Sequence, residues 1–388
     1  ARHPPVDGPG RPVAAWAMLV EEGEEDEQRE DDEGAFARKR CCSAEWRLGA
    51  RGDGGGSPQP SVVMACSPGG FGIEGLAVAA AEALGLWEGL GVRLLEVPGG
   101  ETAVLAALAK GQADMAYVSD VAAIECYMDG HSVRVACSAA LLPARSLLAG
   151  PARDARSAAQ GRWAIEGDGI GLLMASRVMR HVGSAAGPRE IQRSAHAVLP
   201  SSALCAEALV AGAVDCALLR VEEACALNRG GTPPGAGAGG LAAAAVGAPL
   251  GLPELVELAH PMPHGVVATT RHFEQRHPKA CPHVVRGVLR ASRYLHGDAN
   301  LFIQLAQKWV APALSEQELL AIWRRLAQGG AFAVNGGVSR AHWGRRLEEL
   351  AALRTHAANS TYEGLVSCDH VAAAVAKLGR HPGTSDPL

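Results

Sequence analysis

A nine-residue pattern occurs twice in this chain, 101 positions apart, and it constrains the fold more than any other feature of the sequence. The first copy, at 108–116, reads Leu-Ala-Lys-Gly-Gln-Ala-Asp-Met-Ala, and the second, at 209–217, reads Leu-Val-Ala-Gly-Ala-Val-Asp-Cys-Ala. A leucine that closes a helix, a glycine that can adopt the left-handed conformation and an aspartate before a short apolar run are typical of a helix-to-strand junction. Because Leu, Gly, Asp and Ala match at identical spacing, the repeat predicts two related α/β lobes.

The residues around the first copy alternate between strand and helix patterns. The apolar run at 61–65 predicts a buried strand, and a helical pattern follows between Leu76 and Leu84. Residues 92–97 predict a second strand, which a Gly-rich turn connects to a further helix. This alternation is typical of a parallel sheet flanked by helices. The C-terminal third is predicted to be mainly helical, with helices at 282–296, 299–310, 315–328, 339–357 and 368–379.

These patterns divide the chain into three parts. We expect residues 61–145 and 261–388 to form the first lobe with the C-terminal helices, and 146–260 to form the second, with crossovers near 141–150 and 258–266. Within the second lobe, the Gly-, Ala- and Pro-rich stretch at 230–247 is interpreted as a surface loop insertion.

The first 60 residues have a different composition from the rest of the chain. Residues 21–33 hold ten acids and one arginine, a net charge of −9. We expect 1–60 to be a disordered acidic segment, because low hydrophobicity combined with high charge cannot offset the entropy cost of ordering.

Composition excludes several classes of function. Outside the acidic segment at 21–33 the chain carries 35 basic and 31 acidic side chains, so we expect no nucleic-acid partner. No apolar run reaches the length of a membrane span. None of the ten cysteines lies in a Cys-x-x-Cys pair, so we expect mostly reduced thiols and no metal site. No signal peptide is visible, so these residues leave the compartment open.

Two lobes imply a cleft, and the loops at the carboxyl ends of the strands are expected to line it. Residues 99–102 and 167–171 each place Gly-rich backbone before a helix, where free N–H groups suit an anionic oxygen. The candidate ligand-binding residues are Ser67, Phe71, Gly99, Gly100, Glu101, Thr102, Ser119, Asp120, Gly167, Asp168, Gly169, Ile170 and Arg220.

Each candidate side chain also has a purely structural interpretation. Thr102 is equally suited to capping a helix, and Phe71 either stacks on a planar ligand or packs in the core. Arg220 either pairs with an anionic ligand or forms an ion pair with Glu222 or Glu223. We interpret the two repeat aspartates, Asp114 and Asp215, as turn or cap residues.

Several segments in order resemble a known family. The carriers are the helix and strand entry at 83–92, the Gly99-Gly100 turn before the first repeat, the strand and Gly-rich loop at 157–171, the residues 177–179, and the return strand within 261–278. Over roughly 61–380 the chain resembles the solute-binding proteins of ABC importers for nitrate, sulfonate, taurine and thiamine-pyrimidine precursors. That resemblance implies a two-lobed type 2 periplasmic-binding fold, each lobe a mostly parallel sheet flanked by helices.

The same resemblance implies a function. We expect a monomer that captures a small anionic or heteroaromatic solute by hinge closure, with no bond making and no cofactor. An ABC permease would then be its partner, and an extracytoplasmic or periplasmic location would follow for a bacterial protein. The alternative is an enzyme like the thiamine-pyrimidine synthases of the same superfamily, which would use pyridoxal phosphate, with Lys110 as the nearest candidate lysine. A third possibility is a protein-interaction module that acts through its acidic segment.

Overall fold

The structure is a computed structural model that describes residues 61–382, apart from 68–71, 88, 143, 150–160, 167–170, 172, 176, 179–195, 200, 229–246, 251–262 and 354–360. The segment at 1–60, most of the stretch at 230–247 and part of the expected crossover at 258–266 therefore lie outside the described residues.

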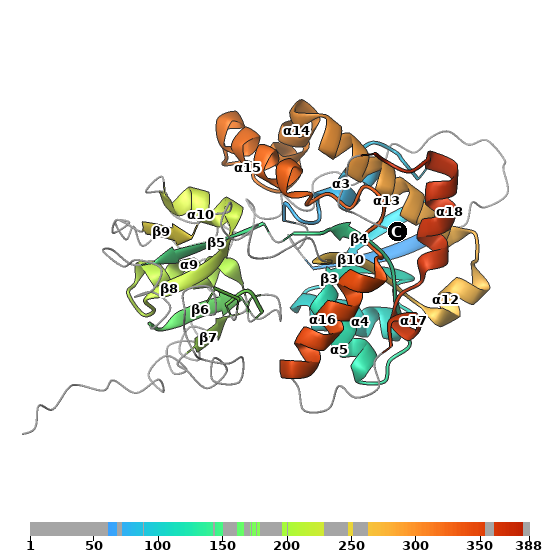
Figure 1. Cartoon of the computed structure of the whole chain (residues 1–388), viewed down its shortest axis with the longest axis horizontal. Coiled ribbons are helices and arrows are strands. Elements are labelled where there is room, and N and C mark those ends of the chain that lie inside the picture. The colour runs from blue at the N-terminus through green and yellow to red at the C-terminus, as the bar shows by residue number, and fades with distance from the viewer. Residues whose placement is uncertain are drawn as a thin grey trace, which may run out of the picture. The chain divides into compact units, whose positions relative to one another are not determined.

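The first sheet has five strands in the order β2-β1-β3-β10-β4 (Figure 1). Its strands are β1 (Ser61–Cys66), β2 (Gly91–Glu96), β3 (Met115–Ser119), β4 (Val133–Ala140) and β10 (Gly265–Thr270). β1 pairs in parallel with β2 and β3, whereas β10 is antiparallel to both of its neighbours. Four of the five strands therefore point the same way, and their carboxyl ends share one edge.

The second sheet repeats this topology with different residues. Its order is β7-β6-β8-β5-β9, and its strands are β5 (Arg145–Ala149), β6 (Trp163–Glu166), β7 (His196–Leu199), β8 (Cys216–Arg220) and β9 (Gly247–Leu250). β6 pairs in parallel with β7 and β8, and β5 is antiparallel to β8 and β9. In each sheet, the antiparallel strand is the one that follows a crossover from the other lobe. The fold class expected from the sequence, a two-lobed α/β fold with mostly parallel sheets, is confirmed.

Helices cover both faces of the first sheet. On one face lie α3 (Leu76–Ala83) and α13 (Ala280–Gly297), with α18 (Cys368–Leu378) beside α13; on the other lie α4 (Gly100–Ala109) and α5 (Asp120–Met128) (Figure 1). The other helices of this part are α12 (Arg271–Arg276), α14 (Ala299–Trp309), α15 (Glu316–Gly329), α16 (Arg340–Leu353) and α17 (Tyr362–Leu365). The expected helical C-terminal third is confirmed.

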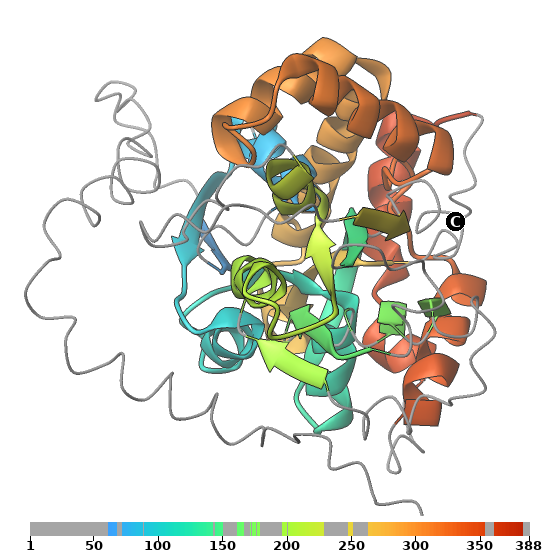
Figure 2. The same cartoon turned by 90° about the vertical axis from the view of Figure 1, so that its left-hand side faces the viewer.

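In the second sheet, α9 (Ser202–Val210) packs on β6 and β8, and α10 (Val221–Asn228) packs on β5 (Figure 2). A small apolar cluster that includes Leu148, Cys205 and Leu219 fills the space beneath these helices. The other face, with Trp163 and Leu218, belongs to a larger cluster that also contains the core of the first sheet. Apolar packing therefore continues through the crossover region and does not stop at each lobe.

The two copies of the repeat form the same junction, one in each sheet. Gly111 and Gly212 have φ values of +69° and +68°, and each donates its N–H to the leucine of its repeat at 3.1 Å. Asp114 Oδ2 accepts from the N–H of Val63 at 2.8 Å, and Asp215 Oδ2 accepts from the N–H of Arg162 at the same distance. Both aspartates thus have a structural role, but they bond the backbone at the neighbouring parallel strand and do not act as the turn or cap residues that were expected.

Candidate functional site

The repeat also aligns the residues that follow it at the carboxyl edge of each sheet. Ser119 ends β3 and Arg220 ends β8, again 101 positions apart. The N–H of Ser119 donates to the Glu101 carboxylate, and the N–H of Arg220 donates to Ser202 Oγ at 2.9 Å. The backbone contacts at the two equivalent positions therefore correspond. The accepting group is the Glu101 carboxylate in the first lobe and the Ser202 hydroxyl in the second. The donating residue carries a hydroxyl in the first lobe and a guanidinium in the second.

In the second lobe, two arginines share one carboxylate. Glu166, the last residue of β6, accepts from Arg220 Nη2 at 2.7 Å and from Arg145 Nη1 at 2.7 Å. Burial by itself raises the pKa of Glu166, but the two guanidinium groups override it and lower the pKa to about 2. Burial by itself lowers the pKa of Arg220, but the Glu166 carboxylate outweighs this effect and holds the pKa of Arg220 above its ordinary value. Arg220 is thus a charged group in a buried ion-pair network, with its side chain 26% exposed.

Glu222 and Glu223 follow Arg220 directly in the first turn of α10. Both carboxylates contribute to raising the pKa of Arg220. The structural alternative expected an ion pair with one of them, whereas the ion pair that the structure shows for Arg220 is with Glu166. Burial, together with the Glu223 charge, raises the pKa of Glu222 to about 8. Burial and the neighbouring carboxylate therefore favour the protonated form of Glu222, which reduces the negative charge beside Arg220.

In the first lobe, the predicted anion site lies at the open N-terminus of α4. Gly99 is the N-cap residue, with φ +102°, and no side chain caps the helix, so the expected capping role of Thr102 is wrong. Thr102 lies in the first turn and is exposed, as are Gly99 and Gly100. Glu101 turns toward Ser119 and accepts from its Oγ at 2.6 Å. The Ser119 hydroxyl also accepts from the N–H of Ala122 and so caps α5.

Asp120 is fully buried and belongs to a different network. Its Oδ2 lies 2.5 Å from Nε of Arg346 on α16, in an ion pair that lacks hydrogen-bond alignment. Burial raises the pKa of Asp120 to about 6, and Arg346 opposes that rise. The structure therefore brings Ser119, Glu101 and Gly99–Thr102 together and turns Asp120 into the interior.

The remaining candidates are placed only in part. Ser67 is half-buried directly after β1, at the same edge as Ser119. Phe71, Gly167, Asp168, Gly169 and Ile170 lie outside the described residues.

Contacts between the two lobes involve residues that the sequence analysis did not select. Glu74 accepts from the N–H of Ala144 at 2.7 Å, and one of its oxygens lies 3.9 Å from Arg145 Nε. Burial raises the pKa of Tyr117. The charges of Glu74 and Glu101 raise this pKa further, and those of Arg220 and Arg145 lower it. Glu166 had a visible signal, since it precedes the Gly-rich loop; Arg145 and Tyr117 had none, because neither lies in a motif.

The described part of the chain contains no group of three or more His, Cys, Asp or Glu side chains placed to hold a metal ion. Lys110 is the C-cap residue of α4, at the opposite end of the helix from Gly99, and it is exposed. Within the described residues, no helix combines the length and apolar character needed to cross a membrane.

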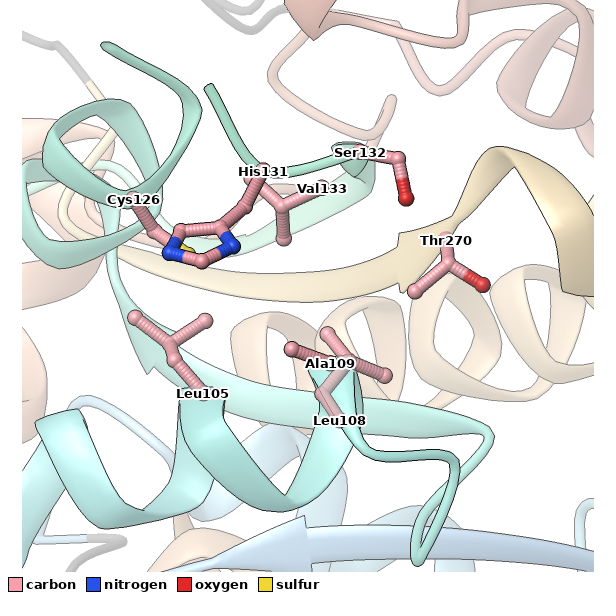
Figure 3. Close-up of a pocket in the computed structure, with 8 residues that line it drawn as sticks. All are labelled: Leu105, Leu108, Ala109, Cys126, His131, Ser132, Val133 and Thr270. Atoms are coloured by element: carbon pink, nitrogen blue, oxygen red, sulfur yellow. The ribbon is translucent and has the colours of Figure 1, made fainter. Parts of the chain in front are cut away.

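A pocket of about 90 Å³ lies at the opposite edge of the first sheet (Figure 3). Leu105 and Leu108 of α4 lie on one side, and Cys126 and His131 lie on the other, with Thr270 at the end of β10. It lies away from the loops predicted to bind a solute.

Comparison with known proteins gives matches of structure but not of sequence. No protein-family model matches the chain, and no curated protein matches it. Among solved structures, the periplasmic sulfonate-binding protein SsuA of a putative sulfonate ABC transporter from Methylobacillus flagellatus KT is 13% identical, with a TM-score of 0.59 over 86% of this chain and 99% of that one.

Two further solved structures have the same architecture. The zinc-bound ligand-binding component of an ABC-type import system from Staphylococcus aureus is 10% identical, with a TM-score of 0.61 over 81% of this chain and 99% of that chain. A conserved Candida albicans gene product with the generic periplasmic-binding-protein fold is 14% identical, with a TM-score of 0.54 over 82% and 95%. The twin sheets and these matches define the class: this chain has the periplasmic-binding-protein fold, as its resemblance implied.

Proposed function

We propose that this protein reversibly binds a small anionic solute between its two lobes and closes around it. The observation that carries the proposal is the pair of equivalent carboxyl edges. One edge presents the uncapped N-terminus of α4 at Gly99, and the other presents the Arg220 guanidinium. Free backbone N–H groups with a helix dipole, together with a guanidinium, are complementary to a compact oxyanion.

The solved structures support the same class of solute. The Methylobacillus flagellatus protein is described as sulfonate-binding, and the Staphylococcus aureus protein as the ligand-binding component of an importer. By analogy, we propose an alkanesulfonate or a similar monoanion as the solute, an ABC permease as the partner and an extracytoplasmic location. The proposed function is binding alone and includes no reaction step.

A thermal-shift screen of alkanesulfonates, taurine, nitrate and aminopyrimidines tests the proposal. A solute present at about 100 times its Kd stabilises the folded state by roughly 2.7 kcal/mol, a rise in Tm of roughly 5 °C. Arg220→Gln is expected to abolish the rise produced by the active solute. Arg162→Gln is the matched control, because Arg162 lies at the opposite edge of the same sheet and its side chain is 53% exposed.

The outcomes separate the alternatives. A rise in Tm that survives Arg220→Gln and is lost in Arg162→Gln would contradict the assigned edge. The absence of any response across the screen would contradict solute binding. An absorbance band of pyridoxal phosphate in the purified protein, lost in Lys110→Ala, would favour the enzyme alternative.

A further inference from the structure

A buried arginine on α16 connects three parts of the fold. Arg346 is 1% exposed, and besides its ion pair with Asp120 at the start of α5 it donates to the Pro263 carbonyl at 3.0 Å. Its Nη2 also lies 3.5 Å from His264 Nε2. Pro263 and His264 directly precede β10, where the chain returns from the second lobe to the first. Arg346 therefore fixes α16 to the end of this crossover.

Glu349 lies one turn further along α16 and extends the network to the second lobe. Its Oε2 lies 3.3 Å from Arg346 Nη1. Both of its oxygens accept from Arg177 Nη2, at 2.7 and 3.0 Å. Arg177 lies in the helical segment after β6, within the connection between two strands of the second sheet, and is 8% exposed. The Arg177–Glu349 pair thus joins the two lobes.

The surroundings make this pair stronger than an ordinary surface ion pair. A surface pair contributes little because both long side chains must be ordered and water screens their charges. Here Arg346 already orients Glu349, and Arg177 is buried, so less ordering is needed and screening is weaker. Separation of the lobes would break both hydrogen bonds between Arg177 and Glu349.

We infer that Arg346, Glu349 and Arg177 form a latch that favours the closed arrangement of the lobes before any solute is bound. Arg346 acts as a positioning residue, and the Glu349–Arg177 pair is the contact that opens. The inference rests on the hinge-closing function proposed above, but its consequence is a property of the protein without solute. A solute whose own contacts close the lobes would act on an equilibrium that the latch already biases.

The test measures the distance between the lobes in the solute-free full-length chain. Spin labels are introduced through a genetically encoded ketone amino acid, because the native cysteines preclude thiol chemistry. The labels replace Leu204 on α9 and Tyr294 on α13, whose side chains are exposed. Pulsed electron spin resonance then gives the distribution of distances in the parent and in each variant.

Glu349→Gln removes the charge and keeps the shape of the side chain. We expect the ratio of long to short distances to rise about tenfold, and Glu349→Asp, which keeps the charge, to retain most of the parent distribution. Arg340→Gln is the matched control, because Arg340 is on the same helix and pairs with Glu363 at the surface, where it is 73% exposed. We expect its distribution to equal that of the parent.

An unchanged distribution in Glu349→Gln, with far-UV circular dichroism showing a folded protein, would overturn the latch. Equal changes in Glu349→Gln and Arg340→Gln would also overturn it, because they would report a general loosening of α16. Neither result bears on the thermal-shift screen, so a failed latch and a failed solute-binding function are distinguishable. Arg177→Lys, which keeps the charge but offers one point of contact, is expected to give a smaller change than Glu349→Gln.

Discussion

One carboxylate, that of Glu166, neutralises charge from two arginines at the edge of the second lobe. It lies between the Arg145 and Arg220 guanidinium groups, and its side chain is 10% exposed. Glu166→Gln is therefore expected to lower the free energy of unfolding by about 3 kcal/mol, because two buried cations lose their common anion. Urea denaturation measures this, with Glu363→Gln as the control for an exposed pair. A loss equal to that of the control would show that the network contributes little to stability.

The same carboxylate predicts a pH dependence. The folded-state pKa of Glu166 is lowered to about 2, whereas an unfolded glutamate titrates near 4.3. The unfolded state therefore binds more protons in this range, and the stabilisation from Glu166 is complete above about pH 4.5 and declines as the pH falls toward 2. Urea midpoints between pH 3 and 7 are expected to fall more steeply in the parent than in Glu166→Gln. Parallel curves would contradict the assigned shift.

At the scale of single elements, the twin helix-to-strand junctions show what the sequence determines. Gly111 and Gly212 both have positive φ, and a Cβ at either position would contact nothing within 4 Å. Replacement by alanine therefore costs backbone strain alone, about 1–2 kcal/mol at each site. Because the two junctions lie in different sheets, we expect the losses in the double variant to add. Thermal or urea unfolding measures each one.

A glycine inside a helix serves as the matched control, because its replacement by alanine is expected to raise the stability of the protein and not to lower it. Gly344 lies within α16, where a Cβ would also meet nothing within 4 Å, so Gly344→Ala is expected to stabilise the protein by about 0.5–1 kcal/mol. A destabilising effect at Gly344, or a neutral effect at Gly111, would contradict the backbone conformations assigned to these two glycines.

Local patterns predicted the elements well because the signals are local. The expected strand at 61–65 is β1, the expected helix at 299–310 is α14, and that at 368–379 is α18. The antiparallel strand β5 was not foreseen inside the crossover at 141–150, because five residues without alternation give no strand signal. The ion pairs at the candidate site were equally hidden. Arg145 reaches Glu166 across 21 positions, and no periodicity connects residues that meet only when the sheet forms.

At the scale of the whole molecule, the sequence predicted the fold class through the repeat and the resemblance, but not how the edges are charged. Each edge already holds a carboxylate of the protein. Ser119 is hydrogen-bonded to Glu101, and Arg220 is hydrogen-bonded to Glu166. A solute must therefore compete with internal anions or rearrange them. We expect this competition to favour a strongly ionised, weakly basic anion such as a sulfonate over a carboxylate of the same size, which the thermal-shift screen measures directly with matched pairs of compounds. Equal shifts for the two members of a pair would contradict it.

The approach of the lobes is best tested at Gly72, which lies close to two residues of the second lobe. A Cβ at this position would lie 3.3 Å from Glu222 Oε1 and 3.5 Å from Arg220 Nη1. Gly72→Leu is expected to hold the two edges apart, so the distance between the labelled helices lengthens and the solute response is lost. Gly89→Leu is the control: Gly89 also has positive φ, so it carries comparable strain, but a Cβ there meets nothing within 4 Å. Gly72→Ala, with one methyl group at that contact, is expected to fall between the parent and Gly72→Leu. If Gly72→Leu folds, as its melting curve would show, and keeps the parent distances, then Gly72 does not meet the second lobe in solution and the assignment of Arg220 to a closing site fails with it.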